Sequence, residues 1–391
     1  ILKVQTKSTQ ESPHTRGGVI MTSIIYVGMD VHTTNYTLCC YSMEDDRFFA
    51  EVQVEPDAKN ILKSLARIEK QQSRDCRIVC GYEAGCLGYS LYHQLHAHGI
   101  DCVILAPTTM MTKPGKRIKT DRRDARLISK CLAFHTYSPV YIPTEVDNAV
   151  KEYIRMRDDA NSALARVKQQ IIAFCIRHGK IHDGKSYWTN KHLEWLSSLD
   201  LGNKILSEVL QEYLIRYYQL REQVDMYDMR INELAQAEPY RQKVEKLGCF
   251  RGIAAHTALS FCVEVGDFRR FATAQQFASY LGLVPGECSS GDKQQYTGIT
   301  KAGNSHLRKL LVETAQVFGR SATKSGKSVA LKERQAKCDS LTVAYADKAN
   351  ARLKKKYFKI AMRSKVNIAK TAVAREMACF IWGSTGCRCA C

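Results

Sequence analysis

Between residues 24 and 134, short apolar runs alternate with polar turns and amphipathic stretches in a distinctive order. Three strand-like runs come first, with the sequences IIYVGMD, NYTLCCYS and RFFAEVQV. A helical stretch over Ala58–Lys70 follows, then the strand-like run CRIVCGYE, the helical run LGYSLYHQLHAHG, the strand-like run DCVILAP and a helix from about Arg122 to Phe134. A three-strand meander followed by alternating helix and strand predicts an α/β domain of the ribonuclease H-like class.

Four carboxylates stand at the ends of these elements. Asp30 closes the first strand-like run and Glu83 closes the fourth, so both should project from the C-terminal ends of buried strands. Asp121 and Asp124 lie three residues apart at a helix start and therefore share one face of that helix. Such hard oxygen ligands suit Mg²⁺ at a site that works on phosphates. One strand-end carboxylate alone is an ordinary turn residue, but the set of four predicts a metal site.

The positive charge of the chain is concentrated at its C-terminal end. The 391 residues carry a net charge of +19, and the last 91 hold 20 Lys and Arg against 5 Asp and Glu. A surface of this kind usually binds a polyanion, which is either nucleic acid or an anionic membrane, although a solvated face is the simpler alternative. No apolar run approaches the roughly 18 residues that a membrane helix needs, so we expect no membrane span.

The sixteen cysteines predict a reducing compartment. Most stand inside apolar runs, where cysteine behaves as a small buried hydrophobe, and no secretory segment opens the chain. We therefore expect reduced thiols in a cytoplasm. Residues 1–22 are polar and aperiodic, so we expect Met21 to be the natural start and the preceding stretch to be upstream read-through or a flexible leader. The C-x-C-x-C tail of Cys387, Cys389 and Cys391 lacks zinc-ribbon spacing and is expected to be an unstructured end.

A long helical region follows, from about Glu145 to Lys246. Its apolar residues alternate spacings of four and three over about four heptads, which is typical of a coiled coil. This seam predicts an arm through which subunits associate, and the alternative is a long amphipathic helix that packs within its own chain. The seam consists of Leu206, Leu210, Tyr213, Tyr217, Leu220, Val224, Tyr227, Ile231 and Leu234.

Two further segments contain glycine turns. The turn Gly252-Ile253-Ala254 lies between two helical runs and resembles a helix-hairpin-helix, although a purely structural hairpin is as good an interpretation. Farther on, Ser289 and Ser290 precede Gly291 in a loop with few apolar residues. Such a loop exposes a hydroxyl group and lets backbone amides approach a phosphate. From local chemistry alone, however, a serine in a Ser-Gly turn is usually only a turn residue.

The motifs together resemble the transposases of insertion-sequence family one hundred and ten, which includes the Piv-type DNA invertases. The resemblance rests on GMDVH, GYEAG and KTDRRDA around the four carboxylates, and on RFATAQQFASYLGLVPGECSSGDKQQYTGITKAGNSHLRKLL. It extends from about Ser23 to Gly383 and includes YADKANARLKKKYF and AREMACFIWG. The resemblance implies four regions: a leader at 1–22, a RuvC-like domain at 23–144 with an Asp-Glu-Asp-Asp set, a helical coiled-coil linker at 145–246, and a mainly α transposase domain at 247–391 with a serine loop.

The resemblance also implies a chemistry. Asp30, Glu83, Asp121 and Asp124 would bind Mg²⁺, and Ser290 would be the nucleophile of an RNA-guided serine recombinase. A structured bridge RNA would pair with donor and target DNA, and the active form would be a homo-oligomer, either a dimer or a tetramer, with sites shared between subunits. Beside the serine, Lys301, Arg308 and Lys309 would contact phosphates, unless they form only a solvated helix face. In the basic end, we expect Lys354, Lys355 and Lys356 to bind phosphates.

Three other functions compete with this interpretation. A RuvC-like nuclease or junction resolvase would use the carboxylates and leave Ser290 passive. A Piv-type site-specific DNA invertase would use the same chemistry within one DNA molecule, and the sequence hardly separates it from a transposase. A non-catalytic nucleic-acid-binding protein is disfavoured because it has no use for four acids in a groove that holds phosphates.

Overall fold

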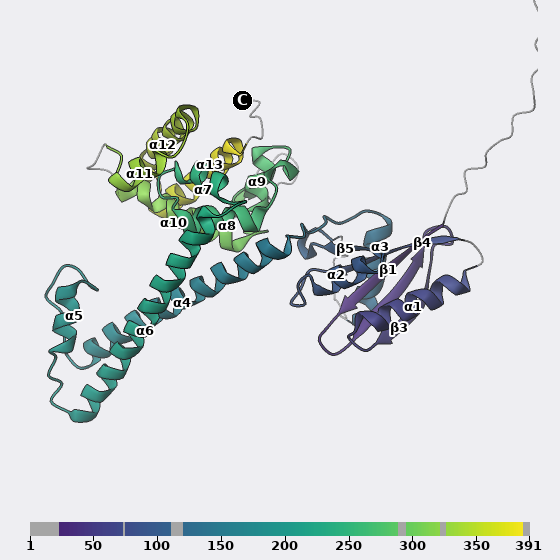
Figure 1. Cartoon of the computed structure of the whole chain (residues 1–391), viewed down its shortest axis with the longest axis horizontal. Helices are drawn as coiled ribbons and strands as arrows, with labels where there is room; N and C mark the ends of the chain where they lie inside the picture. Colours follow the sequence, from purple (N-terminus) through teal and green to yellow (C-terminus); the bar gives the residue numbers. More distant parts are fainter. Residues whose placement is uncertain (1–22, 73–74, 111–119, 288–294, 321–325, 386–391) are drawn as a thin grey trace, which may run out of the picture. The chain divides into compact units, whose positions relative to one another are not determined.

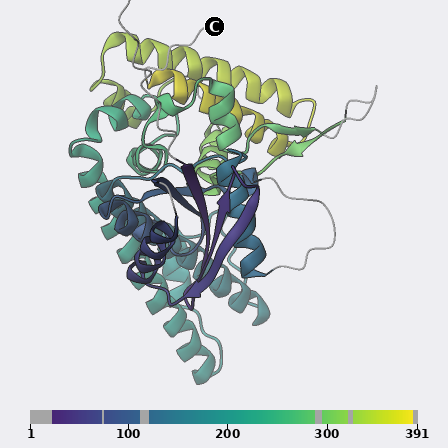
Figure 2. The same cartoon turned by 90° about the vertical axis from the view of Figure 1, so that its right-hand side faces the viewer.

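A computed structural model describes residues 23–72, 75–110, 120–287, 295–320 and 326–385, and it divides the chain into two compact units (Figures 1 and 2). The first unit is Ile1–Ile142 and the second is Pro143–Cys391. Each unit is treated separately below. The expected leader, Ser289 and Ser290, and the cysteine tail lie outside the described residues.

The first unit is built on one mixed five-stranded sheet. The strand order is β3-β2-β1-β4-β5, in which β1, β2 and β3 are antiparallel neighbours while β4 and β5 run parallel to β1. This arrangement confirms the expected ribonuclease H-like α/β class. The strands are β1 (Ser23–Val31), β2 (Tyr36–Ser42), β3 (Arg47–Val54), β4 (Cys76–Glu83) and β5 (Asp101–Leu105).

Helices cover both faces of this sheet. On one face, α1 (Ala58–Gln71) and α2 (Ser90–Ala97) pack against the odd-numbered residues of β1, such as Val27. On the other face, α3 (Asp121–Ala133) packs against Tyr26. Because side chains alternate along a strand, the even-numbered positions of β1 all face α3. A short 3-10 helix, η1 (Pro107–Thr109), follows β5.

In the second unit, two long helices lie side by side. The helix α6 (Lys204–Gln236) runs back along α4 (Glu145–Arg177), and α5 (Asn190–Ser197) lies in the connection between them (Figure 1). The heptad seam of α6 is buried here: Leu210, Tyr217 and Val224 pack with α4 residues such as Ile171. This corrects the expectation that the seam residues meet a second subunit, because the long helix packs within its own chain.

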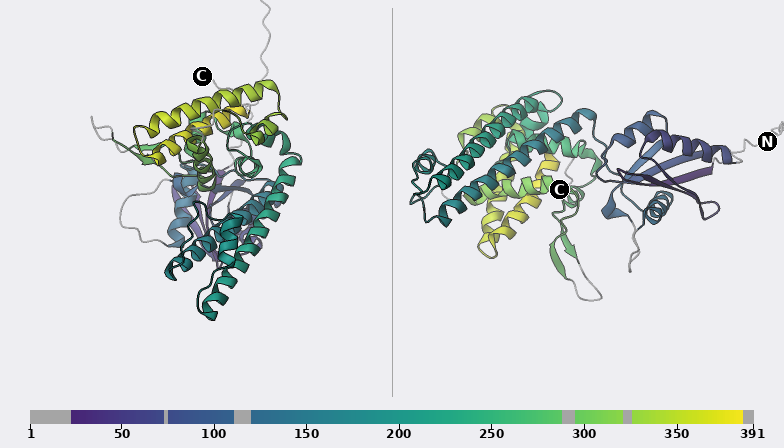
Figure 3. Two further views of the ribbon diagram at one scale, coloured as in Figure 1. Left: turned by 90° about the vertical axis from the view of Figure 1, so that its left-hand side faces the viewer. Right: turned by 90° about the horizontal axis from the view of Figure 1, so that it is seen from below.

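The rest of the second unit is mainly helical and shares one large core. The neighbouring helices α12 (Ser340–Ala361) and α13 (Val366–Ser384) pack over α10 (Ser305–Arg320), and a narrow ribbon of two strands leaves the helical body (Figure 3). The other elements are α7 (Arg241–Gly248), α8 (Ala255–Val265), η2 (Phe268–Arg270), α9 (Ala274–Tyr280), β6 (Pro285–Glu287), β7 (Tyr296–Ile299) and α11 (Val329–Gln335). Among the described residues, none of the helices combines the length and apolar character of a membrane span.

Candidate active site

A glycine in β1 lets α3 lie directly on the sheet. A Cβ atom at Gly28 would overlap the carbonyl oxygen of Ala125 and the amide nitrogen of Ser129. Both of these helix residues are fully buried, so a larger residue at Gly28 would push α3 away from β1. Two residues after Gly28 on the same face of the strand stands Asp30, so the close approach brings the start of α3 towards that carboxylate.

The start of α3 is fixed by a side-chain cap. Thr120 adopts an extended conformation, and its hydroxyl accepts a hydrogen bond from the backbone N–H of Arg123. A threonine in this position satisfies one of the amides that a helix start leaves unpaired. Asp121 and Asp124 follow in the first turn, where negative charge is favoured by the helix dipole. The cap therefore sets both the first residue of α3 and the position of its two carboxylates.

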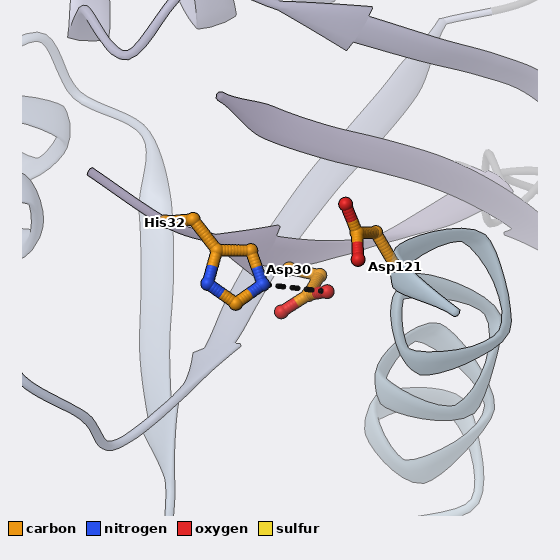
Figure 4. Close-up of side chains that lie close together, drawn as sticks. All are labelled: Asp30, His32 and Asp121. Atoms are coloured by element: carbon orange, nitrogen blue, oxygen red, sulfur yellow. Dashed lines mark hydrogen bonds and ion pairs between the residues drawn. The ribbon is translucent and has the colours of Figure 1, made fainter. Parts of the chain in front are cut away.

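Asp30, His32 and Asp121 converge at the end of β1 (Figure 4). Each side chain offers one ligand atom, and these three atoms lie within 4.8 Å of one another. The Nε2 atom of His32 lies 3.3 Å from Oδ2 of Asp30. The side chain of Asp30 is 15% exposed and that of His32 is 48% exposed, so the cluster is open to solvent on the histidine side.

The electrostatic surroundings of Asp30 suit a site that binds a cation. Burial raises the pKa of Asp30, and the neighbouring carboxylates of Asp124 and Asp121 raise it further, while His32 lowers it. The net result is a raised pKa. A carboxylate placed among other carboxylates in this way is stabilised in its charged form when a metal ion binds between them.

Two of the four predicted carboxylates lie in this cluster, and the other two do not. Asp30 and Asp121 are in the cluster, and Asp124 is close enough to influence the pKa of Asp30. Glu83 ends β4, the parallel neighbour of β1, on the α3-facing side, and its exposed carboxylate is outside the cluster of three ligand atoms. The histidine of GMDVH was missed as a ligand. Its position two residues after Asp30 was the available signal, because alternate residues of an extended chain point the same way.

The donor set of this cluster fits a divalent metal ion. Two carboxylate oxygens and one imidazole nitrogen within 4.8 Å can share one ion, and further positions remain for water or a phosphate oxygen. Mg²⁺ and Mn²⁺ prefer oxygen ligands, whereas an imidazole ligand suits ions such as Zn²⁺ or Fe²⁺ better. The residues therefore support metal-dependent chemistry and leave the identity of the ion open.

The base of the β6–β7 ribbon, which carries the serine loop in the sequence, is rigidly attached to the helical body. The backbone N–H of Asn304 donates to the carbonyl of Tyr280 at 2.9 Å, and its side-chain amide donates to Glu264 at 3.0 Å. Gly303 has a φ of 72°, and a Cβ atom there would overlap the Tyr280 carbonyl. Arg308 donates through Nη1 to the carbonyls of Leu281 and Ala302, each at 3.0 Å. These contacts hold residues 280–284 against residues 300–304.

The predicted phosphate-binding residues have different surroundings. Lys301 and Lys309 are exposed, whereas Arg308 is half-buried and already bonded to two carbonyls. Lys355 is exposed, Lys354 is half-buried, and the ammonium group of Lys356 lies 2.5 Å from the carboxylate of Glu376. Arg308 thus has a structural role that the sequence did not predict. Phosphate binding by this set stays a prediction.

The turn after α7 uses its amides within the protein. The backbone N–H of Arg251 donates to the side chain of Asn350 at 2.9 Å, and that of Ile253 donates to the carbonyl of Phe250 at 3.2 Å. A phosphate clamp needs such amides to be free. The contacts therefore favour the structural hairpin over the phosphate clamp.

A second cluster of ionisable groups lies inside the helical unit. Asp158 of α4 contacts His306 Nε2 at 2.7 Å and Arg157 at 3.1 Å, and His256 Nε2 approaches it at 2.9 Å without hydrogen-bond geometry. Glu264 of α8 lies 3.4 Å from His306 Nδ1. Burial would raise the pKa values of both acids, but these partners outweigh it, so the pKa of Asp158 is far below its usual range and that of Glu264 falls to about 2.

The fold and the metal cluster define the class of this protein, which is a ribonuclease H-like enzyme that depends on a divalent metal. Comparison with known families makes the assignment specific. The family model described as "Transposase IS116/IS110/IS902 family" matches residues 245–333, and a second model, described as "Transposase" and named for the DEDD transposases of IS110, matches residues 27–176. The match to residues 27–176 includes nearly all of α4, so residues 177–244, which hold α5 and α6, lie between the two matches.

Curated relatives agree with these matches. The chain is 36% identical over 302 residues to a putative transposase, y4qE, of Sinorhizobium fredii, which covers 77% of this chain and 73% of the relative. It is 32% identical over 340 residues to the transposase for insertion sequence element IS1533 of Leptospira borgpetersenii, which covers 85% of this chain and 95% of the relative. The chain belongs to the IS116/IS110/IS902 family of transposases, enzymes of DNA strand transfer.

Proposed function

We propose that this chain is an RNA-guided DNA transposase that cuts and rejoins strands through a covalent serine–DNA intermediate. The observation that carries the proposal is the convergence of Asp30, His32 and Asp121 in a member of this family. Phosphodiester cleavage develops negative charge on the scissile phosphate, and a cluster that can hold a divalent ion is suited to stabilise that charge. The basic C-terminal quarter of the chain supplies the complementary surface for DNA.

In this proposal, Asp30, Glu83, Asp121 and Asp124 hold Mg²⁺. A divalent ion bound there supplies positive charge that stabilises the phosphate and lowers the cost of deprotonating a hydroxyl. Glu83 ends the neighbouring strand, and in this proposal its exposed carboxylate completes the set. The support is the shared sheet edge of β1 and β4, since the C-terminal ends of parallel neighbours lie together.

Ser290 is the proposed nucleophile. Its Oγ forms a bond to the scissile phosphorus, the bond from phosphorus to the 3′ oxygen breaks, and the leaving oxygen takes up a proton to become a free 3′ hydroxyl. The 3′ hydroxyl of a partner strand then attacks the phosphoserine bond, which restores a phosphodiester and the serine hydroxyl. Because the phosphoester bond is exchanged, strand joining needs no ATP.

The nucleic acids and the assembly belong to the same proposal. Lys301, Arg308 and Lys309, together with the Lys354–Lys356 run, contact phosphates of DNA or RNA. A structured bridge RNA pairs with donor and target DNA and selects the sites. The active form is a homo-oligomer, a dimer or tetramer, in which the carboxylates of one subunit serve the serine of another. Since the α6 seam packs against α4, association through the arm uses its outer face.

The test is to trap the serine adduct on labelled DNA and map it. The full chain is incubated with DNA that carries the element junction, with and without a transcript of the non-coding DNA flanking the gene, and separated on a denaturing gel. We expect a covalent species that depends on the transcript, is lost in Ser290→Ala and is kept in Ser289→Ala. The reverse pattern would move the role by one residue. An adduct that survives in both variants, or cleavage without any adduct, would replace this proposal with a metal-only nuclease.

A further inference from the structure

A large groove lies beside the β6–β7 ribbon in the helical unit. Its volume is about 1280 Å³, which exceeds the roughly 300–1,000 Å³ of typical small-molecule pockets. Residues of the ribbon such as Ile299 line it together with residues of α9, α12 and α13. All of these elements belong to one compact unit. A groove of this size that opens to the surface favours a polymer segment over a small ligand.

The floor of the groove is apolar and partly aromatic. Tyr345 of α12 and Phe380 of α13 line it, and their rings meet edge-to-face with centroids 5.9 Å apart. Both side chains are partly exposed. Ile299, which is partly exposed, adds aliphatic surface from the ribbon base. A surface of this kind offers favourable contact to the flat faces of nucleobases.

The walls of the groove are basic. Lys348, Arg352 and Lys356 recur every four residues along α12 and therefore form one stripe, and all three line the groove. Lys301 of the ribbon base and Arg375 of α13 add two more cations, and among the described residues of the lining Glu376 is the one carboxylate.

Glu376 does not neutralise this surface. Its carboxylate contacts Lys356 at 2.5 Å and also contacts Arg352. Burial would raise the pKa of Glu376, but these two cations outweigh burial and lower it. The buried acid thus holds two cations on the wall. Among the residues that the structure describes, Lys348 and Arg375 form no ion pair, so they are available to an anionic ligand.

We infer that this groove binds an unpaired DNA strand, with bases on the Tyr345–Phe380 floor and phosphates on the Lys348–Arg375 walls. The inference rests on the proposed strand-joining function, but it does not depend on which serine reacts. In duplex DNA the base faces are stacked on one another and the apolar floor would stay empty, so an unpaired strand fits the floor and the walls together. DNA is the expected occupant because the family transfers DNA strands, and a strand must be unpaired while it is exchanged.

The test compares unpaired and paired DNA on matched charge variants. Binding of the full chain to a labelled 12-nucleotide oligothymidylate and to a 12-base-pair duplex is measured by fluorescence anisotropy in EDTA. We expect Lys348→Ala/Arg375→Ala to weaken the single strand about tenfold and the duplex less than twofold. The slope of log affinity against log salt for the single strand should fall by about 1.4, since each phosphate that the protein no longer neutralises lowers the slope by about 0.7.

The matched control is Lys354→Ala/Lys355→Ala. These residues lie on the same helix and remove the same charge, but they do not line the groove. We expect this pair to weaken both ligands by the same factor. An equal loss for both ligands with the groove pair would overturn the inference. Oligouridylate bound more than tenfold more tightly than oligothymidylate, with the same sensitivity to the groove pair, would overturn it in favour of an RNA strand.

A second readout does not depend on substitution. Wild-type protein is cross-linked by light to an oligothymidylate that contains 5-iododeoxyuridine, and the adduct is mapped by mass spectrometry. We expect the adducts in the segments 345–356 and 371–380, and adducts confined to residues 23–142 would overturn the inference. Both measurements are made without metal and involve no covalent serine step. Loss of groove binding with an intact serine adduct therefore refutes only this inference, and the opposite result refutes only the serine proposal.

Discussion

The two clusters of carboxylates in this molecule differ in how their negative charge is balanced. Burial raises the pKa of Asp30, and Asp124 and Asp121 raise it further, so that it stays raised although His32 lowers it. Asp158 and Glu264, in the other unit, contact His306 and arginines, and the pKa values of both are lowered. One cluster is left with excess negative charge that a cation can neutralise, and the other is neutralised by its own protein. Burial of acidic side chains alone therefore does not identify a catalytic site. Acids whose negative charge is not neutralised by neighbouring cations of the protein are the better indicator.

The largest expected effect follows from removing a negative charge at the cluster of Asp30, His32 and Asp121, which has excess negative charge. Asp30→Asn should lower strand transfer at least a thousandfold, or about 4 kcal/mol in the barrier, because the ligand set loses a charge. Folding should not suffer, since the change relieves repulsion among desolvated acids. Recombination assays with Mg²⁺ and thermal unfolding measure the two effects, and nucleic-acid affinity serves as the control. Full activity of this variant in chelator-treated buffer would show that the cluster is not a catalytic metal site.

The same Asp→Asn change at the second cluster, whose charges are balanced within the protein, should lower the stability of the fold instead of the rate of strand transfer. Asp158→Asn removes one charged partner from Arg157, which keeps Asp228, and one from His306, which keeps Glu264. We expect the free energy of unfolding of the helical unit to fall by about 2–3 kcal/mol. This is less than the 3–5 kcal/mol of a fully buried broken pair, because the side chain of Asp158 is 20% exposed.

Tryptophan fluorescence during chemical denaturation isolates this effect. All three tryptophans, Trp188, Trp195 and Trp382, lie in the second unit. Asp228→Asn is the control, since Asp228 also binds Arg157 but its side chain is 37% exposed, and we expect a loss below about 1 kcal/mol. Equal losses for the two variants would mean that the Asp158 network is no more than a surface ion pair.

The order of elements in the first unit could be predicted because its determinants are local. Apolar runs such as that ending at Asp30 are short, alternate with turns and have the period of strands. Thr120 before Asp121 is a helix-start signal within four residues. Sequence reasoning therefore brought Asp30 and Asp121 into one site, and the cluster confirms that they meet. His32 was overlooked because a single histidine after a strand has no distinctive pattern.

The parts that could not be predicted depend on residues far apart in the chain. The contact between Asp158 and His306 joins positions 148 residues apart, and no local spacing indicates it. The groove requires α12, α13 and the ribbon base to pack together, so the sequence shows Lys348 and Arg352 only as part of its basic C-terminal end. Likewise, the seam of α6 has the same spacing whether its partner is α4 or another subunit. Periodicity shows which face is buried and does not show what buries it.

The smallest expected effect is a pH dependence that originates in the compensated cluster. Burial would lower the pKa of His306, but Asp158 and Glu264 outweigh burial and raise it to about 9. In the unfolded chain the pKa is about 6.5. A raised folded-state pKa means that the stabilisation is complete below about pH 6.5 and is lost as the pH rises through about 9.

We therefore expect the helical unit to lose about 2 kcal/mol of unfolding free energy between pH 6.5 and 9. This loss is smaller than the full pKa shift of His306 implies, because its side chain is 18% exposed. Denaturation followed by tryptophan fluorescence at the two pH values measures it. His306→Gln should be less stable at pH 6.5 and should lose the part of the dependence that the histidine contributes, whereas the thiols of Cys249 and Cys262, whose pKa values burial raises to about 12, keep theirs. His192→Gln is the control: burial lowers the pKa of His192, so its contribution changes below pH 6.5 and the dependence above it should persist. If His306→Gln keeps the wild-type slope, the histidine is neutral in the folded protein and the second cluster is not compensated as its distances indicate.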